Sequence, residues 1–142
     1  GLAFAVNTQL WTCEVPILHF GSDEQKDRYL PRLVRGEIIG GHASSEPNPG
    51  SDVFSMETRA EKIDGERWKI SGSKTFVTNG PIADLLIVFA KTGQAKGFGA
   101  GITAFLIETS APGFSSGAPL RLVKRKRCSR SRPWTSPSPG CR

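Results

Sequence analysis

The dipeptide Asp64-Gly65 is the sequence feature that most narrows the fold of this chain. It separates two runs, Met56–Ile63 and Glu66–Ser71, and in the second run Trp68 and Ile70 alternate onto one face. Both positions of the tightest hairpin turns need a positive φ, which Asp-Gly adopts readily. The sequence therefore predicts an antiparallel β-hairpin with a two-residue turn.

Further strand patterns lie on both sides of this hairpin. A strand is expected to begin at Ile38-Ile39-Gly40-Gly41, and a short one at Thr75–Thr78. The continuous apolar core of Asp84–Ala90 is typical of a strand that is buried on both faces. Ile102–Glu108 predicts another strand, and Ala111-Pro112-Gly113-Phe114 predicts a turn after it.

The first part of the chain has helical patterns instead. Apolar spacing in Gly1–Trp11 indicates a helix, which Pro16 interrupts. Ser22-Asp23-Glu24-Gln25 has the pattern of a capping box, and Gly36 is placed to end the helix that it starts. Pro31 is expected to bend or re-initiate that helix.

Helices followed by antiparallel strands indicate an α+β fold. We predict a partial helical domain, the end of an N-terminal α-helical domain at residues 1–36. A small antiparallel, β-barrel-like or orthogonal β-sheet domain follows at residues 37–120. Residues 121–142 form a basic, Ser/Pro-rich tail that cannot bury a core, and we expect this tail to be disordered.

The net charge of +6 comes entirely from that tail. Residues 121–142 contain 8 basic residues and no acidic residue, whereas residues 1–120 have a net charge of −2. The basic charge therefore says little about the partners of the folded part. The three cysteines, Cys13, Cys128 and Cys141, have neither metal-ligand nor disulfide-framework spacing, which indicates a reducing compartment without a structural metal. No apolar run approaches the roughly 20 residues of a membrane span, and no secretory signal pattern is present.

Two polar segments have the composition of a ligand site. His42–Asp52 combines the hydroxyls of Ser44, Ser45 and Ser51 with a turn rich in proline and glycine, so that backbone N–H groups and hydroxyls can converge. In Lys74–Gly80, an extended chain would place Phe76 and Thr78 on the same face. We expect the two segments to hold a flat polar ligand between them.

On these residues, the chain resembles the acyl-CoA dehydrogenase family over roughly Gly1 to Leu120. The most specific parts are Ser45-Glu46-Pro47…Gly50-Ser51-Asp52 and Lys74…Thr78-Asn79-Gly80, preceded by Phe20-Gly21-Ser22-Asp23-Glu24-Gln25-Lys26. Three positions depart from the family pattern. Ser44 replaces an aliphatic residue, Pro49 a small residue, and Phe76 a frequent Trp.

The resemblance implies an FAD-dependent α,β-dehydrogenation of an acyl thioester, here in a fragment. It places cofactor-binding residues at His42, Ala43, Ser44, Ser45, Ser51, Phe76, Val77 and Thr78. Ser45 and Thr78 would donate toward the flavin edge, Phe76 would pack on the ring, and Ser51 would reach the cofactor phosphates or the acyl substrate. No catalytic residue is assigned, because the family's base comes from a C-terminal helical region that the fragment lacks.

The resemblance also suggests partners. We expect an acyl-CoA or acyl-carrier-protein thioester as substrate, an electron-acceptor flavoprotein or oxygen as oxidant, and a homo-oligomer for the full-length protein. The compartment would be the cytoplasm in a bacterium or the mitochondrial matrix in a eukaryote. An acyl-CoA oxidase and a dehydrogenase of carrier-bound acyl groups remain alternatives. We expect neither a membrane nor a nucleic acid as partner.

Several other features have simpler interpretations. Glu46 is expected to brace its turn instead of serving as the base, and residues 93–101 are expected to form a surface connection because they lack a phosphate-binding motif. The tail leaves open a non-catalytic protein that binds nucleic acids or acidic surfaces. It also resembles an altered reading of the gene or a truncated alternative ending, since the family continues there with a recognisable strand that is absent here.

Overall fold

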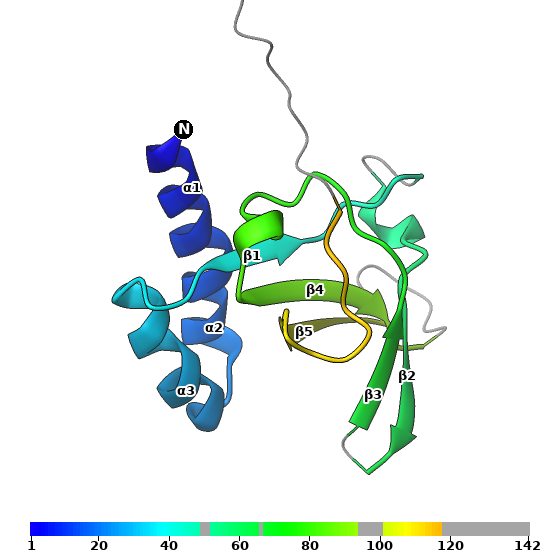
Figure 1. Ribbon diagram of the computed structural model, residues 1–142. Helices are drawn as coiled ribbons and strands as arrows, with labels where there is room; N and C mark the ends of the chain where they lie inside the picture. The colour runs from blue at the N-terminus through cyan, green and yellow to red at the C-terminus, as the bar shows by residue number, and fades with distance from the viewer. Residues whose placement is uncertain (49–51, 66, 94–100, 118–142) are drawn as a thin grey trace, which may run out of the picture.

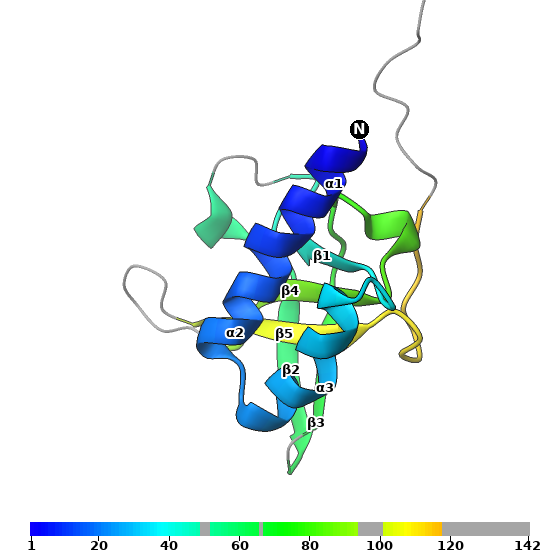
Figure 2. The ribbon, with the colours of Figure 1, turned by 90° about the vertical axis from the view of Figure 1, so that its left-hand side faces the viewer.

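The computed structural model describes residues 1–48, 52–65, 67–93 and 101–117. In this part of the chain, helices occupy the first third and pack against one side of a mixed β-sheet (Figures 1 and 2). The α+β class is thus confirmed. The tail at residues 121–142 lies outside the described residues, as do Ser51, most of the 93–101 connection and the other two cysteines, Cys128 and Cys141. None of the described helices has the length and hydropathy of a membrane span.

The N-terminal helix is longer than its sequence pattern predicts. α1 (Leu2–Gln9), a π-helical segment (Leu10–Glu14) and α2 (Val15–Phe20) follow one another without a break. Pro16 does not end the helix, because it falls in the first turn of α2, where its missing N–H is tolerated. The π-helical segment lies directly before it, so the change in helical pitch accompanies the proline.

The second helix, α3 (Asp23–Val34), has the predicted ends. The Ser22 hydroxyl accepts the Gln25 N–H, and the Gln25 side chain accepts the Ser22 N–H, which completes the capping box. At the other end Gly36 has φ 69°, and the Glu37 N–H donates to the Arg32 carbonyl across the closing turn. α3 runs through Pro31, so the predicted re-initiation there is wrong.

Among the described residues, five strands form one sheet, with β4 (Leu85–Lys91) at its centre. β1 (Gly40–Ala43) pairs with β4 in parallel, and β5 (Ile102–Glu108) pairs with β4 in antiparallel orientation. β2 (Arg59–Asp64) meets β4 in parallel at Arg59, and β2 pairs with β3 (Arg67–Ser71) in the predicted hairpin. The sheet is therefore mixed rather than purely antiparallel, and it is not closed into a barrel within the described residues.

Two details differ from the predicted strands. In the hairpin, Asp64 pairs with Arg67 and the register shifts between Lys62 and Asp64, so the turn lies one residue later than expected and follows a β-bulge. Thr75–Thr78 is not a strand, because Phe76 has φ 55° and Thr78-Asn79 forms a turn. The turn at Ala111–Phe114 is confirmed by a hydrogen bond from the Phe114 N–H to the Ala111 carbonyl.

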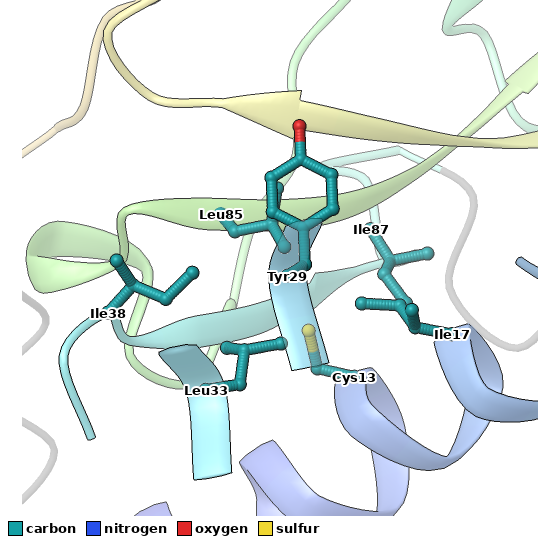
Figure 3. Packing of buried hydrophobic residues seen from close by; sticks show 7 residues of the cluster. All are labelled: Cys13, Ile17, Tyr29, Leu33, Ile38, Leu85 and Ile87. Atoms are coloured by element: carbon teal, nitrogen blue, oxygen red, sulfur yellow. The ribbon is translucent and has the colours of Figure 1, made fainter. Parts of the chain in front are cut away.

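Successive side chains of β4 enter two different hydrophobic clusters. Leu85 and Ile87 face the helices, in a cluster completed by Cys13, Ile17, Tyr29, Leu33 and Ile38 (Figure 3). Leu86 and Val88 face the opposite side, where they pack with Ala43 and Ala83. This explains why the strand is apolar from Leu85 to Ala90. The Cys13 thiol is free, and its burial raises its pKa to about 12.

Candidate functional site

β1 brings the helices, the sheet and the first polar segment together. A Cβ on Gly40 would lie 2.6 Å from the Cys13 Sγ, on the helical side. A Cβ on Gly41 would lie 2.9 Å from Leu86 Cδ2 and 3.0 Å from the Thr78 carbonyl oxygen, on the other side. Because any larger residue would force these neighbours apart, the two glycines allow both layers to approach the strand closely.

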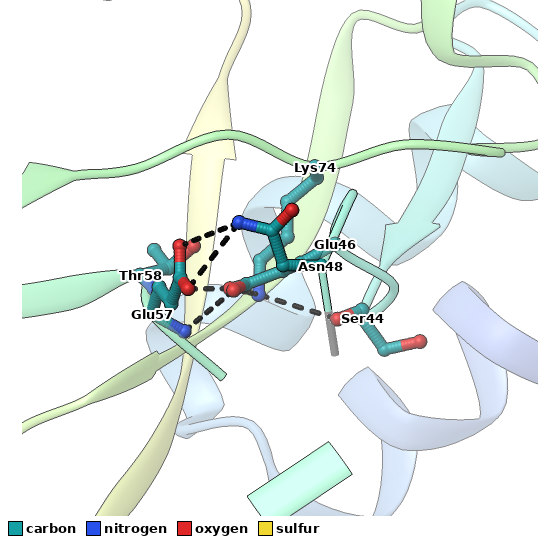
Figure 4. A network of polar contacts seen from close by, with 6 residues as sticks. All are labelled: Ser44, Glu46, Asn48, Glu57, Thr58 and Lys74. Atoms are coloured by element: carbon teal, nitrogen blue, oxygen red, sulfur yellow. Dashed lines mark hydrogen bonds and ion pairs between the residues drawn. The ribbon is translucent and has the colours of Figure 1, made fainter. Parts of the chain in front are cut away.

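The two predicted ligand-binding segments lie against each other just after β1. The Thr75 N–H donates to the Ser45 carbonyl at 2.9 Å. The Lys74 ammonium donates to the Ser44 carbonyl at 3.3 Å and to Glu46 Oε1 at 2.7 Å (Figure 4). The structure therefore joins His42–Asp52 to Lys74–Gly80, as the sequence analysis expected.

Glu46 and Lys74 form a buried ion pair at the centre of this junction. Their side chains are only 3% and 9% exposed, respectively. The Glu46 carboxylate also accepts the Glu57 N–H at 2.5 Å and the Thr58 N–H at 3.0 Å. Burial disfavours the charged carboxylate, but these hydrogen bonds and that from Lys74 outweigh it and lower the Glu46 pKa to about 2. Glu46 thus braces its turn, as predicted.

Three hydroxyl groups of the two joined segments are not engaged by other groups of the described residues. In the described part of the chain, the side chains of Ser44, Ser45 and Thr78 make no hydrogen bond, although the Ser44 and Ser45 carbonyls do. Ser45 is exposed and Thr78 is half-buried, so neither hydroxyl is sealed beneath packed side chains. These are uncommitted donors, suited to the polar edge of a ring system.

Phe76 and Val77 take different positions from those of an extended chain. Phe76 is 71% exposed and has a positive φ, an unusual conformation for a bulky residue. Val77 instead packs against the cluster that contains Ala43. Its side chain therefore supports the loop from the core side, while the Phe76 ring is presented to solvent.

His42 and Ala43 point to opposite faces of β1. His42 Nδ1 lies 3.1 Å from the Thr12 carbonyl oxygen in the helical layer, whereas Ala43 packs in the cluster on the other face. The two side chains cannot both line one surface, because neighbouring residues of a strand alternate. If one ligand contacts all of the residues from His42 to Ser45, some of those contacts must therefore be made by backbone atoms instead of side chains.

An open cleft of about 1240 Å³ lies on the face of the sheet that bears the Ala43 cluster. Its walls are Gly72–Thr78, Ala111–Gly117 and parts of β3, β4 and β5, with Trp68 and Phe105 in edge-to-face contact. Residues 42–45 do not line it. The segment 74–78 therefore has the junction with Ser44–Glu46 on one side and this cleft on the other.

Two groups of polar contacts were not identified from the sequence. Asn79, at φ 64°, donates from Nδ2 to the carbonyls of Ala5 and Gly40, both at 3.3 Å, and so ties the loop to α1 and β1. Arg28 and Tyr29 donate to Glu108 at 2.6 and 3.0 Å and tie α3 to β5. The position of Asn79 could have been anticipated, because asparagine tolerates a positive φ. No local sequence pattern indicates the contacts of Arg28 and Tyr29 with Glu108.

A helical layer packs on a mixed sheet, and a buried ion pair joins two hydroxyl-bearing loops beside that sheet; these features define an α+β module with a candidate ligand site. Residues 41–130 match the family profile described as "Acyl-CoA dehydrogenase, middle domain", and residues 1–37 match "Acyl-CoA dehydrogenase, N-terminal domain". The chain belongs to the acyl-CoA dehydrogenase family.

Individual relatives agree with this assignment. The chain is 42% identical over 135 residues to L-prolyl-[peptidyl-carrier protein] dehydrogenase of Serratia sp. (strain ATCC 39006), a match that covers 95% of this chain and 33% of the relative. It is 48% identical over 120 residues to mitochondrial isovaleryl-CoA dehydrogenase of Oryza sativa subsp. japonica. This match covers 84% of this chain and 28% of the relative. This chain thus spans about a third of the length of these relatives.

A solved structure, an FAD complex of PigA, has the same fold. It superposes with a TM-score of 0.74 at 44% identity, over 79% of this chain and 29% of that one.

Proposed function

We propose that this chain is part of an FAD-dependent dehydrogenase of acyl thioesters, and that residues 42–45 and 74–78 contribute to its flavin site. The observation that carries the proposal is the junction itself. Two loops far apart in sequence are fastened by Lys74, Glu46 and the Thr75–Ser45 bond, and they hold unpaired hydroxyls and an exposed ring beside it. The FAD complex of a structural neighbour supports the cofactor.

The residues present fit such a cofactor. When bound, FAD supplies the capacity to accept a hydride from the substrate's β-carbon. Ser45 and Thr78 would hold the cofactor by donating hydroxyl hydrogens to its ring system, and preorganised donors of this kind stabilise negative charge that develops on a bound group. The exposed Phe76 ring offers a packing face, and Val77 holds that loop to the core.

The remaining cofactor residues are proposed more narrowly. His42 and Ala43 lie on opposite faces of β1, so we propose that the segment 42–44 contributes through its backbone and through the Ser44 hydroxyl. Ser51 lies outside the described residues. We retain it as a candidate contact to the cofactor phosphates or the acyl carrier.

We propose no catalytic base within this chain. Glu46 is the carboxylate nearest the two loops in sequence, but its pKa of about 2 and its three hydrogen-bond donors make it a poor proton acceptor. A base from a helical region that this chain does not contain is consistent with relatives about three times as long.

Two classes of substrate are supported by the relatives. The rice protein is named for an acyl-CoA, and the Serratia protein for a prolyl group on a carrier protein. An acyl-CoA is the first candidate substrate. A carrier-bound acyl group is the second, and it is supported by the match to the carrier-protein enzyme, which covers more of this chain than the match to the rice protein does. We further propose an electron-acceptor flavoprotein or oxygen as oxidant and a homo-oligomer as the complete protein. The compartment would be cytoplasmic in a bacterium and mitochondrial in a eukaryote.

A chimera tests the flavin site directly. Residues 42–80 of this chain replace the corresponding segment of PigA, a protein solved with FAD, and the FAD content after purification is measured by absorbance. We expect the chimera to retain FAD and the Thr78→Val change to reduce that content, because valine keeps the shape and loses the donor. Thr78→Ser, which keeps a hydroxyl, is the matched control.

Two results would count against the proposal. A folded chimera without FAD would show that this segment does not fit the flavin. Equal FAD content in the Val and Ser variants would remove the Thr78 hydroxyl from the site.

A further inference from the structure

His42 makes a hydrogen bond that specifies where its proton lies. Its Nδ1 is 3.1 Å from the backbone carbonyl oxygen of Thr12. A carbonyl oxygen can only accept, so Nδ1 must carry the hydrogen and donate it. In a neutral imidazole the other nitrogen, Nε2, is then the acceptor.

Pro16 removes one donor that the Thr12 carbonyl could otherwise have. Thr12 lies in the π-helical segment Leu10–Glu14, and the N–H of residue 16, which would donate to this carbonyl in a regular α-helix, is missing in a proline. The Thr12 hydroxyl is itself used, donating to the Thr8 carbonyl at 2.7 Å. A half-buried backbone carbonyl needs a donor, and His42 supplies it from the neighbouring strand.

The imidazole ring is held on a second side by Phe89. The two ring centroids are 5.1 Å apart, with an interplanar angle of 55°. Nearby, the Gln9 side chain accepts the Gly40 N–H at 3.0 Å, a second link between the same helical run and β1. β1 leads directly into Ser44–Glu46, so these links determine where the first loop of the candidate site begins.

We propose that His42 is a positioning residue. Fixed as the Nδ1–H tautomer by the Thr12 carbonyl, to which Pro16 cannot donate, it holds β1 and the Ser44–Glu46 loop against the helical layer, and it presents Nε2 as its one acceptor. Only the consequence for flavin binding rests on the proposed function. The tautomer and the link between layers do not.

The first test is the tautomer, read from long-range ¹H–¹⁵N NMR spectra of the ¹⁵N-labelled chain. The chain has two histidines, and His19 is exposed, so it serves as an internal control. We expect a pure Nδ1–H pattern for His42 and an averaged pattern for His19. An Nε2–H pattern at His42, or one averaged like that of His19, would overturn the assignment. Pro16→Ala restores a helical N–H and should shift His42 toward averaging; an unchanged pattern would refute the role of Pro16.

The second test separates positioning from simple packing. His42→Asn places an amide donor near the position of Nδ1, His42→Gln extends it toward that of Nε2, and His42→Phe keeps only an aromatic ring. The readout is hydrogen exchange of the Thr75 amide, which is bonded to the Ser45 carbonyl, with the Phe114 amide as reference. We expect exchange at Thr75 to rise between about two- and tenfold in the Phe and Gln variants, as for one lost hydrogen bond, and less in the Asn variant.

Equal effects in all three variants would refute the positioning role, and so would an unchanged Thr75. Both tests are made without FAD. A chimera that fails to bind FAD would therefore refute the proposed flavin site and leave these results standing.

Discussion

Replacing Glu46 by Gln should destabilise the fold strongly at neutral pH and much less in acid. Glutamine keeps the shape of the side chain but removes the charge that compensates Lys74, whose side chain is 9% exposed. It also loses an acceptor, since its amide nitrogen cannot accept the Glu57 or Thr58 N–H. Breaking a buried ion pair from one side typically costs about 3–5 kcal/mol of unfolding free energy.

The pKa of Glu46 gives a second estimate of that magnitude. It falls from 4.5 to about 2 on folding, and a tenfold change in proton affinity corresponds to about 1.4 kcal/mol, so ionisation of Glu46 stabilises the fold by about 3 kcal/mol. Because the folded-state pKa is depressed, this contribution is fully present above pH 4.5 and is lost as the pH falls toward 2. The difference between wild type and variant should shrink over that interval.

The assay is urea denaturation followed by tryptophan fluorescence at several pH values. Asp64→Asn is the matched control, because Asp64 forms an ion pair with Arg67 in which both side chains are more than half exposed, and its loss should cost far less than that of the buried pair. The double change Glu46→Gln/Lys74→Met removes both charges and should be more stable than Glu46→Gln alone. A cost for Glu46→Gln equal to that of the control, or independent of pH, would refute the reasoning.

Two other contacts lead us to expect changes in the free energy of unfolding at neutral pH when they are altered. Gly41→Ala places a Cβ 2.9 Å from Leu86 and 3.0 Å from the Thr78 carbonyl, and overpacking of this kind should cost about 1–3 kcal/mol. Gly93→Ala, where nothing lies within 4 Å, should change little, and equal costs would show that β1 tolerates the extra atom. Tyr29→Phe removes the hydrogen bond to Glu108 and should cost about 1 kcal/mol in denaturant titrations, while Arg28 still pairs with Glu108. No measurable loss would mean that the tyrosine hydroxyl is equally well satisfied by water.

The elements that sequence reasoning located well are those fixed by local chemistry. The capping box at Ser22 and the turn at Ala111–Phe114 each depend on a few adjacent residues. The apolar run of β4 depends only on burial of both its faces. The pairing of the two polar loops was also anticipated, although from the resemblance and composition rather than from any contact visible in the sequence.

The errors arise where a distant segment decides the outcome. Thr75–Thr78 has β-branched and aromatic residues, yet it is a loop with a positive φ at Phe76. Its neighbours Lys74 and Asn79 bind other elements, and Asn79 also has a positive φ. β1 and β4 lie more than forty residues apart, so their parallel pairing follows from tertiary packing. Pro16 suggested a helix end, but the helical run continues through it after a π-helical segment, and the Thr12 carbonyl in that segment contacts His42.

Because β1 contacts both the helical layer and the cluster on the opposite face of the sheet, the candidate site depends on both. Gly40 and His42 meet the helices, whereas Gly41 and Ala43 meet the opposite cluster and the Thr78 carbonyl, and the strand is only four residues long. A displacement of the helical run must therefore move β1, and with it the carbonyls of Ser44 and Ser45 that bind Lys74 and Thr75. Since Lys74 also neutralises Glu46, such a displacement would disturb the buried ion pair as well. Substitutions in the helical layer, remote from the free hydroxyls, should thus alter the candidate site through this strand.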